Sequence, residues 1–308
     1  MHKKVLVIGS GSIANKHIKI LKKNNYKVFV YSKNKNFKNI TSKVSLLKNF
    51  DFLPKVDFAV IANETYKHLE FIKILAKKKI NIYCEKPLYH KKINFNILRN
   101  LIKKNKIIFF TGYQLLQDTK IKYLKNFLKK NKVKSYIVKV GHDFEKWRLK
   151  RPSKKNYFTS VSKGGGVIFE LVHEINLIQN LFGDISSIKS YKSNSLKFKC
   201  EDTAVSIIKN KEIIGLLYQD MFSKIFFRNI TIVTIKKDLV ELDFIGNFIK
   251  INRRLIKFKE SNQQLNLIEK NLKMMNSKIR NKDFSMKYFD DSVKDLTVCL
   301  KMHLSKHT

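Results

Sequence analysis

The chain contains little proline, glycine or cysteine for its 308 residues. Three prolines and 10 glycines exclude a collagen-like or low-complexity chain, and an apolar content of 44% excludes a disordered one. The three cysteines, Cys84, Cys200 and Cys299, lie far apart and form no C-x-x-C pair. We therefore expect neither a disulfide framework nor a metal site.

Acidic residues and arginine are also scarce. The sequence has 24 Asp and Glu against 64 Lys and Arg, a formal charge of +40, yet only seven of the basic residues are arginine. The abundant Lys, Asn, Ile and Phe all have A/T-rich codons, and no stretch alternates Arg with aromatic residues as nucleic-acid-binding stripes do. A Lys-rich solvated surface is therefore expected in preference to a specific nucleic-acid partner.

Long apolar runs are absent. The first apolar run covers only residues 5–8 and ends at a Gly/Ser turn. A secretory signal needs an apolar core of about 7–15 residues. No stretch without Asp, Glu, Lys or Arg exceeds 11 residues, and a membrane span needs about 20 apolar residues. These absences predict a soluble, cytoplasmic protein without a membrane partner.

The first third of the chain alternates short apolar runs with amphipathic, Lys-rich segments. This alternation is typical of βαβ units and a parallel sheet. The expected strands are residues 5–8, 27–31, 57–62, 80–84 and 107–111, and the expected helices lie near 13–21, 69–76 and 93–101. Residues 1–118 are therefore predicted to form an N-terminal α/β Rossmann domain with a doubly wound parallel sheet.

The pattern changes near residue 133, where apolar residues begin to alternate as in half-buried strands. The expected strands are residues 135–140, 204–208, 229–235 and 239–245, and the expected helices are 170–181, 264–280 and 290–304. Residues 119–308 are therefore predicted to form a C-terminal α+β domain with a large, mostly antiparallel sheet. One face of this sheet is expected to cover substrate and the other to pair with another subunit.

A glycine-rich loop joins the first expected strand to the first expected helix. Its sequence, Gly9-Ser10-Gly11-Ser12-Ile13-Ala14, fits the G-x-G-x-x-[GA] pattern of dinucleotide-binding folds. Gly9 allows a tight turn, Gly11 lets the backbone approach a pyrophosphate, and Ala14 allows close helix packing. The alternative is a Gly/Ser turn in another α/β protein, but the strand before the loop and the helix and strand after it favour dinucleotide binding.

The end of the second expected strand bears on the choice between NAD and NADP. NAD-binding domains usually place an acid there to accept hydrogen bonds from the ribose, but no Asp or Glu occurs between Gly9 and Asp51. Ser32 and Lys33 stand there instead, and a hydroxyl and a cation suit a 2'-phosphate. The sequence therefore modestly favours NADP over NAD as the cofactor.

Later segments, together with the glycine loop, resemble the Gfo/Idh/MocA oxidoreductases, a family that includes glucose-fructose oxidoreductase and inositol dehydrogenase. One segment is Ala62-Asn63-Glu64-Thr65 with His68, followed by Cys84-Glu85-Lys86-Pro87-Leu88. Another consists of Gly164-Gly165-Gly166, Glu170, His173 and Asn176, and of Leu181-Phe182-Gly183. Trp147-Arg148 and Tyr157 resemble elements of members found beside surface-sugar biosynthesis genes. The resemblance spans essentially the whole chain.

Oxidation of a sugar hydroxyl requires a proton acceptor, a cation for the developing negative charge, and a hydride acceptor. Lys86 follows the carboxyl end of a strand, where open parallel sheets bind ligands, and can supply the cation. His173, on a helix after a flexible triple glycine, can act as the base, and Glu170 can orient it from one helical turn earlier. The resemblance implies that this Lys and His hold one substrate oxygen. The structural alternatives are a surface lysine and a buried histidine without a catalytic role.

The motifs and the resemblance together predict the residues of the site. Cofactor contacts are expected from Gly9, Gly11, Ser12, Ile13, Ala14, Ser32, Lys33, Asn63, Thr65, His68, Glu85 and Lys86. Substrate contacts are expected from Trp147, Arg148, Tyr157 and Asn176. The chain departs from the family pattern at Glu170 and Asn176, where the family has Asp, and at Leu116-Gln117, where many relatives have Arg-Phe.

The sequence predicts an NAD(P)-dependent oxidoreductase that transfers hydride to or from a carbinol or keto carbon of a sugar or nucleotide-linked sugar. Trp147 and Tyr157 favour a place in polysaccharide or amino-sugar biosynthesis. The departures leave a second hypothesis, a cofactor-bound binding or regulatory relative without turnover. A basic nucleic-acid binder with an incidental glycine loop is a third. A homo-oligomer formed through the C-terminal sheet is also expected.

Overall fold

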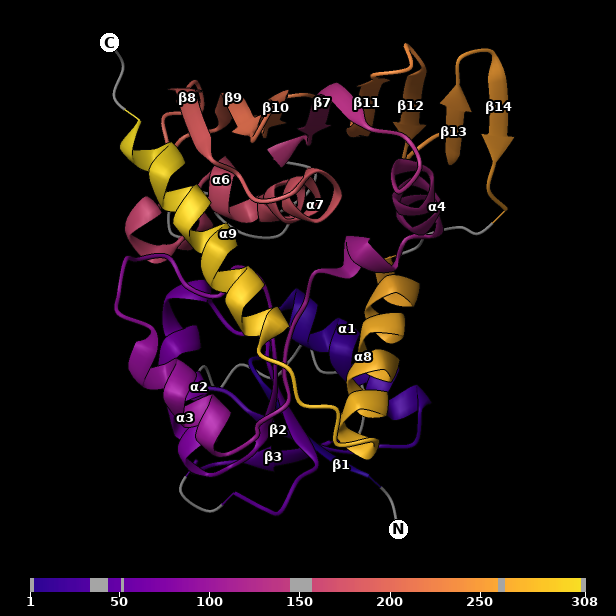
Figure 1. The fold of residues 1–308 in the computed structure, drawn as a ribbon. Helices are drawn as coiled ribbons and strands as arrows, with labels where there is room; N and C mark the ends of the chain where they lie inside the picture. The colour runs from indigo at the N-terminus through magenta and orange to yellow at the C-terminus, as the bar shows by residue number, and fades with distance from the viewer. Residues whose placement is uncertain (1–2, 34–43, 51–52, 145–156, 260–263, 306–308) are drawn as a thin grey trace. The chain divides into compact units, whose positions relative to one another are not determined.

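The computed structural model describes residues 3–33, 44–50, 53–144, 157–259 and 264–305 (Figure 1). The chain folds into two compact units. We call Met1–Gln114 with Gln263–Val293 the Rossmann unit, and Leu115–Asn262 with Lys294–Thr308 the sheet unit. The chain passes from one unit to the other after residues 114, 262 and 293, so neither unit is a single continuous stretch.

The Rossmann unit contains a six-stranded parallel sheet in the order β3-β2-β1-β4-β5-β6. Its strands are β1 (Lys4–Ile8), β2 (Lys27–Tyr31), β3 (Ser45–Leu47), β4 (Phe58–Ile61), β5 (Asn81–Cys84) and β6 (Phe109–Thr111). Helices α1 (Ser12–Lys23), α2 (His68–Lys77) and α3 (Asn96–Lys104) follow β1, β4 and β5. The predicted doubly wound α/β fold is confirmed, and its strand order reverses beside β1, where such sheets bind ligands.

Helix α8 (Gln264–Arg280) belongs to the Rossmann unit, whereas the sequence analysis placed these residues in the C-terminal domain. Its Ile268 and Leu272 are buried in one apolar cluster with Leu21 of α1. The helical period of residues 264–280 identifies their apolar face but not the element that covers it. The difference therefore arises from tertiary packing between segments far apart in the sequence.

The sheet unit is built on an eight-stranded sheet in the order β14-β13-β12-β11-β7-β10-β9-β8. Its strands are β7 (Val133–Gly141), β8 (Ser187–Ser193), β9 (Thr203–Asn210), β10 (Ile213–Asp220), β11 (Phe227–Thr234), β12 (Leu239–Asp243), β13 (Phe248–Ile251) and β14 (Arg254–Lys257). Neighbouring strands are antiparallel except β7 and β10, which run parallel. The predicted large, mostly antiparallel sheet is confirmed.

The two faces of this sheet differ in burial. The α-helices among its described residues are α4 (Thr119–Leu128), α6 (Val167–Glu170), α7 (Val172–Phe182) and the C-terminal part of α9 (Lys287–Leu304). Along β7, Tyr136 and Val138 are buried, whereas Ile137 between them is 41% exposed. Ile137 lies in register with Leu216 of β10, which in turn lies in register with the exposed Ile207 of β9. An apolar row therefore crosses the exposed face of the sheet.

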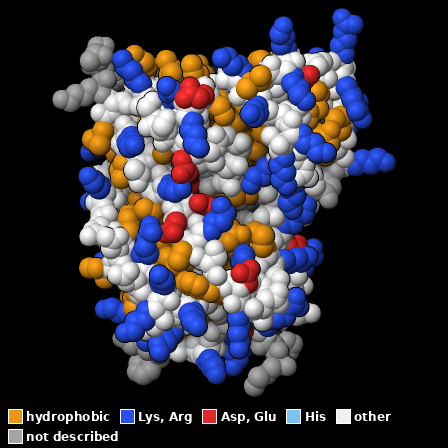
Figure 2. Space-filling view, in the orientation of Figure 1, with side chains coloured by type: hydrophobic (Ala, Val, Ile, Leu, Met, Phe, Trp, Pro, Cys, Tyr) orange, Lys and Arg blue, Asp and Glu red, His pale blue; other side chains and the backbone are white. Residues whose placement is uncertain are grey.

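Lys and Arg side chains are scattered over the face shown in Figure 2, not gathered into one patch. Among the helices of the described residues, none combines the length and apolar character needed to cross a bilayer. Within the same residues, no group of three or more His, Cys, Asp or Glu side chains is arranged to hold a metal ion.

Candidate functional site

The loop between β1 and α1 packs tightly against the residues that follow β4. Gly9 has a φ of +121°, and its N–H donates to the carbonyl oxygen of Tyr31 at 2.8 Å. A Cβ on Gly9 would lie 2.6 Å from the carbonyl oxygen of Ala62, so both the backbone conformation and this contact require glycine. The first glycine of the motif therefore fixes the path of the loop.

The N-terminus of α1 offers backbone N–H groups to an anion. Gly11 is the N-cap in an extended conformation and has no side chain to cap the first turn, which contains no acidic residue. First-turn N–H groups have no partner within their own helix, and the helix dipole adds partial positive charge. Ser12 is exposed at this end, Ile13 is half-buried and Ala14 is fully buried. The arrangement fits the pyrophosphate of a dinucleotide.

Asn63 and Thr65 follow β4 at the same edge of the sheet. The side-chain oxygen Oδ1 of Asn63 is buried, and none of the described residues donates a hydrogen bond to it. A buried acceptor without a donor is costly, so this atom suits a ligand that brings a donor. Thr65 is 3% exposed and begins the short 3-10 helix η1 (Thr65–Lys67). Asn63 is therefore the member of this pair that best fits a cofactor contact.

His68, another predicted cofactor residue, is almost fully buried between two loops. Nδ1 lies 3.0 Å from the carbonyl oxygen of Pro87, and Nε2 lies 3.1 Å from that of Asn63. Burial lowers the pKa of His68, although the two carbonyl contacts oppose this shift. Because both ring nitrogens face protein carbonyls, His68 positions Asn63 and the turn after β5. A direct contact of His68 with the cofactor, which the resemblance implies, stays a prediction.

Glu85, also predicted to contact the cofactor, lies beside α1. Its Oε1 lies 2.7 Å from Nε2 of the fully buried His17. A Cβ on Gly112 would lie 2.9 Å from the other carboxylate oxygen of Glu85, so this glycine leaves room for the carboxylate. His17 was not among the site residues predicted from the sequence. The sequence signal that could have identified it is a histidine on the apolar face of the first expected helix, because a buried histidine needs a polar partner.

Lys86 is the second residue after β5 and is half-buried. The N–H of Glu85 donates to the carbonyl oxygen of Ile61 at 2.9 Å, so the chain still runs beside β4 as it reaches Lys86. The Lys86–Pro87 peptide bond is cis. The contact of His68 with Pro87 ties this turn to Asn63. Lys86 therefore lies at the same edge of the parallel sheet as the glycine loop.

Ser32 and Lys33 follow β2, and each contacts a different element. Ser32 Oγ lies 3.1 Å from Oγ of Ser10 in the glycine loop. Lys33 Nζ lies 2.9 Å from Oε1 of Glu70 in the first turn of α2. No acid precedes Asp51 in this part of the sequence, but the fold brings Glu70 to Lys33 from 37 residues further along the chain. The end of β2 therefore has a carboxylate that the local sequence did not reveal.

The triple glycine of the sheet unit is closely packed, whereas the sequence analysis expected it to be flexible. A Cβ on Gly165 would lie 2.3 Å from the carbonyl oxygen of Phe158, and one on Gly166 would lie 2.3 Å from Oε1 of Glu201. Gly166 also has a φ of +97°. These two glycines therefore permit close contacts that fix the chain immediately before α6.

Glu170 and His173 belong to two successive short helices. Glu170 ends α6, His173 is the second residue of α7, and Leu171 lies between the helices with φ −104° and ψ 33°. The predicted spacing of one turn on a continuous helix is therefore interrupted. Both side chains are almost fully buried. Glu174, which follows His173, forms a buried ion pair with Arg228 on β11. Its Oε1 lies 2.8 Å from Nε of Arg228, and this contact anchors the first turn of α7 to the sheet.

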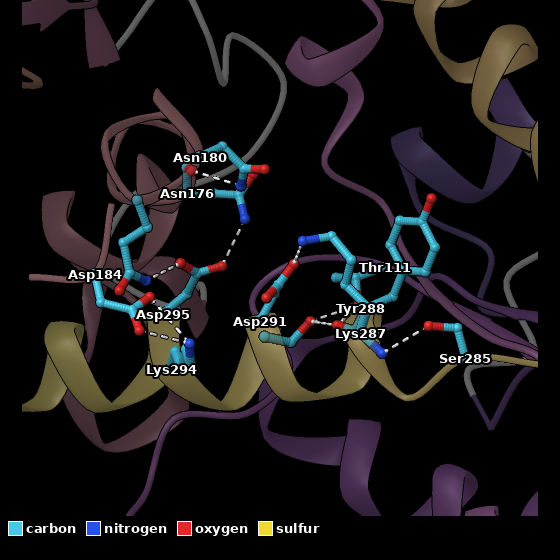
Figure 3. Close-up of polar contacts among 12 residues, drawn as sticks. Thr111, Asn176, Asn180, Asp184, Ser285, Lys287, Tyr288, Asp291, Lys294 and Asp295 are labelled. Atoms are coloured by element: carbon cyan, nitrogen blue, oxygen red, sulfur yellow. Dashed lines mark hydrogen bonds and ion pairs between the residues drawn. The ribbon is translucent and has the colours of Figure 1, made fainter. Parts of the chain in front are cut away.

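Asn176 lies one turn further along α7 and faces Asp295 of α9 (Figure 3). Its Nδ2 donates to Oδ2 of Asp295 at 2.8 Å, and Nε2 of Gln179 donates to Oδ1 of the same carboxylate at 2.6 Å. Asn176 is 2% exposed and Asp295 is 1% exposed. Substrate binding by Asn176 stays a prediction, and in the structure its amide group joins α7 to α9. The sequence could not show this because the partner lies 119 residues away.

Replacing Asn176 with Asp, the residue of the family pattern, is expected to destabilise the protein by about 2–4 kcal/mol at pH 7. Two buried carboxylates would then face each other, and a like charge disfavours ionisation of its neighbour. The loss should therefore shrink in acid, where one carboxylate of the pair takes up a proton. Urea unfolding of the variant and the wild type over a range of pH measures it.

Asn180→Asp is the matched control for this prediction. Asn180 lies one turn further along α7, and its Oδ1 is 3.5 Å from Nζ of Lys125, so the new carboxylate would face a cation. Its cost should be clearly smaller than that of Asn176→Asp. Equal costs for the two variants would contradict the pairing of Asn176 with Asp295.

Glu201 holds the start of α6 and lies close to His303. Its Oε1 accepts a hydrogen bond from the N–H of Ile168 at 3.2 Å, and its Oε2 lies 3.6 Å from Nδ1 of His303. Burial raises the pKa of Glu201 to about 7 and lowers the pKa of His303 to about 4. Between about pH 4.5 and 7 the folded protein keeps a proton on Glu201 that the unfolded chain loses, so this contribution to stability falls as pH rises. The contribution of His303 changes in the opposite direction, rising between about pH 4 and 6.5.

Glu201→Gln is expected to remove the falling contribution while keeping an acceptor for the N–H of Ile168. The unfolding free energy of the variant minus that of the wild type should therefore rise between about pH 4.5 and 7, by up to about 3 kcal/mol. Urea unfolding at several pH values measures this difference, in which groups unaffected by the substitution cancel. A difference that does not change with pH would contradict the raised pKa of Glu201.

The remaining predicted residues lie in the sheet unit or outside the described residues. Tyr157 begins the short 3-10 helix η4 (Tyr157–Thr159) of the sheet unit, with its ring beside Phe158. Leu116 and Gln117 end the 3-10 helix η2 (Gln114–Gln117). Trp147 and Arg148 lie outside the described residues. The interpretation of these positions therefore still rests on the sequence pattern.

The glycine loop, the N-terminus of α1 and the buried acceptor of Asn63 define a Rossmann domain of the dinucleotide-binding class. Residues 3–113 match the family GFO_IDH_MocA, described as an oxidoreductase family with an NAD-binding Rossmann fold. Over these residues the chain matches the Gfo/Idh/MocA oxidoreductases.

Two curated proteins resemble this chain over 133 residues, which is 42% of its length. Myo-inositol 2-dehydrogenase of Thermotoga maritima is 24% identical, and 2,7-anhydro-N-acetylneuraminate hydratase of Escherichia coli is 23% identical. The matched stretch spans only 37% and 34% of these relatives. The similarity is therefore limited to part of each protein.

Solved structures resemble the chain over 99% of its length. Levoglucosan dehydrogenase in complex with NADH and levoglucosan has a TM-score of 0.88 at 12% identity, with 97% of that chain covered. UDP-N-acetylglucosamine 3-dehydrogenase from Acidithiobacillus ferrooxidans has a TM-score of 0.84 at 15% identity, with 98% covered. At these identities the similarity establishes the fold alone.

Proposed function

We propose that the protein is an NAD(P)-dependent oxidoreductase that transfers hydride to or from a carbinol or keto carbon of a sugar or nucleotide-linked sugar. The observation that carries this proposal is the position of Lys86 at the edge of the sheet that also presents the glycine loop. His68 supports it, because its two ring contacts link Asn63 to the turn that contains Lys86. The family of the Rossmann domain supplies the class of reaction.

In the proposed reaction, side chains of the protein stabilise the developing charge and transfer the hydroxyl proton. Lys86 binds the reacting oxygen of the substrate and stabilises the negative charge that develops on it. His173 accepts the hydroxyl proton during oxidation and returns it during reduction, and Glu170 orients the substrate or the imidazole. A nicotinamide cofactor, when bound, accepts or supplies the hydride. The first-turn N–H groups of α1 and Asn63 would hold it.

The proposed substrate class follows from relatives and from the sequence around Tyr157. Two similar structures are named for dehydrogenases of levoglucosan and of UDP-N-acetylglucosamine, and a curated relative is named for an inositol. Trp147, Arg148 and Tyr157 are the proposed substrate contacts, which favours surface-polysaccharide or amino-sugar biosynthesis. One relative is named a hydratase, so a substrate panel should be analysed for products as well as for NADH or NADPH.

Incubation with a panel of sugars and nucleotide sugars, with NAD and NADP in turn, tests the proposal. Formation of NADH or NADPH at 340 nm, together with a substrate-dependent product by mass spectrometry, would support it. Binding of a dinucleotide without turnover on any panel member would instead favour the second hypothesis, a binding or regulatory relative. Glu170 and Leu116 are the departures that motivate this alternative. Asn176 is a weaker reason for this alternative, because its amide group has a structural partner.

The proposed homo-oligomer would form through the exposed face of the eight-stranded sheet. Ile207 and Ile214 are 53% and 59% exposed on this face, beside Leu216 and Ile137. An apolar face of this kind favours a partner with a matching surface, and a second copy of the chain supplies one. The molar mass in solution, measured by light scattering, tests the idea. A mass of one chain at micromolar concentration would contradict it.

A further inference from the structure

Lys33, the second residue after β2, lies where Rossmann domains contact the adenosine ribose of a dinucleotide. Lys33 Nζ is 2.9 Å and 3.3 Å from the two carboxylate oxygens of Glu70. The same ammonium lies 5.9 Å from the centre of the Phe71 ring, and the Tyr31 ring packs edge-on against that ring at 5.9 Å. Helix α2 therefore holds both the end of β2 and the cation that follows it.

We propose that Glu70 sets the choice between NAD and NADP by occupying Lys33. This inference rests on the proposed function, in which the glycine loop binds a dinucleotide. The 2'-phosphate of NADP needs Lys33, and Glu70 competes for the same cation while repelling the phosphate. The 2'-hydroxyl of NAD is uncharged and can donate a hydrogen bond to a carboxylate. Glu70 therefore lowers the affinity for NADP and leaves the affinity for NAD unchanged or raises it.

The exposure of the pair suits this role. The side chains of Lys33 and Glu70 are 52% and 47% exposed, so a ligand can reach both. Exposed ion pairs are weak, and this one can open for a phosphate at a modest cost. Glu70 also lies in the first turn of α2, where a carboxylate interacts favourably with the helix dipole and stabilises the helix. That second effect changes stability, and melting temperatures of the variants separate it from ligand selection.

Fluorescence titration with NADH and NADPH tests the proposal in the wild type and in Glu70→Gln. The Kd for NADPH is expected to fall about threefold to tenfold in the variant, whereas the Kd for NADH should stay unchanged or rise. The change should shrink at high salt, because exposed charges are screened. In a Lys33→Met background, Glu70→Gln should change the ratio of the two Kd values clearly less, because competition for Lys33 is then absent and only the direct effects of the carboxylate remain.

Asp283→Asn is the matched control, since it removes one negative charge from an exposed acid of the Rossmann unit that pairs with Lys278 at 2.5 Å. An unchanged ratio in Glu70→Gln, or an equal change in the control, would overturn the role of Glu70 and leave dinucleotide binding intact. So would a change of the same size in the Lys33→Met background. Failure of the wild type to bind either dinucleotide would overturn the proposed function and this inference together.

Discussion

Lys86→Met is expected to lower turnover about 100- to 1000-fold, the usual effect of removing one group that stabilises charge in the transition state. Methionine keeps most of the volume of the lysine stem and removes its cation. The loss should appear mainly in kcat, because the charge on the substrate oxygen develops as the reaction proceeds. Steady-state rates on the substrate identified in the sugar panel measure the effect.

Lys92→Met is a suitable control for this prediction, because it removes an exposed lysine from the same segment after β5. Its rate should remain close to that of the wild type. Melting temperatures of both variants should change little, since Lys86 is only half-buried. A Lys86→Met protein that turns over at a near-normal rate would remove this lysine from the proposed mechanism.

His173→Asn is expected to lower turnover about 100- to 10,000-fold, the contribution of a positioned acid-base group. An imidazole must be neutral to accept the hydroxyl proton, so the rate of oxidation in the wild type should fall in acid as the ring takes up a proton. The variant should lose this acid limb of the pH–rate profile. Dinucleotide affinity should be unchanged, because the Rossmann unit holds the cofactor in the proposed mechanism.

His142→Asn makes the same substitution elsewhere in the sheet unit, at a half-buried ring that stacks on Phe226. It should keep the wild-type pH profile. A His173→Asn profile with an intact acid limb would show that another group titrates. If dinucleotide binds firmly and no sugar supports hydride transfer in the wild type, the binding or regulatory hypothesis replaces the enzyme.

The order of elements in the Rossmann unit could be predicted because its signals are local. A buried parallel strand such as β1 is a short apolar run, and the amphipathic period of α1 is visible within a few turns. Gly9 illustrates the limit of such reasoning. The motif identifies the glycine, but the structure gives the reason, a backbone contact with Ala62 that leaves no room for a side chain.

The parts of the site that the sequence did not reveal depend on distant partners. Glu70 reaches Lys33 from another helix, His17 reaches Glu85 across the sheet edge, and Asp295 reaches Asn176 from the C-terminal helix. Residue type and spacing show that such side chains need partners, but not which partners the fold supplies. The break at Leu171 was not predicted either, because the apolar pattern continues through it, whereas its backbone angles leave the helical range.

The distant position of α8 in the sequence has a consequence for how the protein is made. Helix α1 completes its apolar contacts only with Ile268, Leu272 and Met275 of α8. At a synthesis rate of about 5–20 residues per second, α8 leaves the ribosome on the order of 10–50 s after α1. During this interval the nascent Rossmann unit shows an uncovered apolar face, the kind of surface that chaperones bind and that promotes aggregation. A fragment that stops near residue 118 would keep that face uncovered permanently.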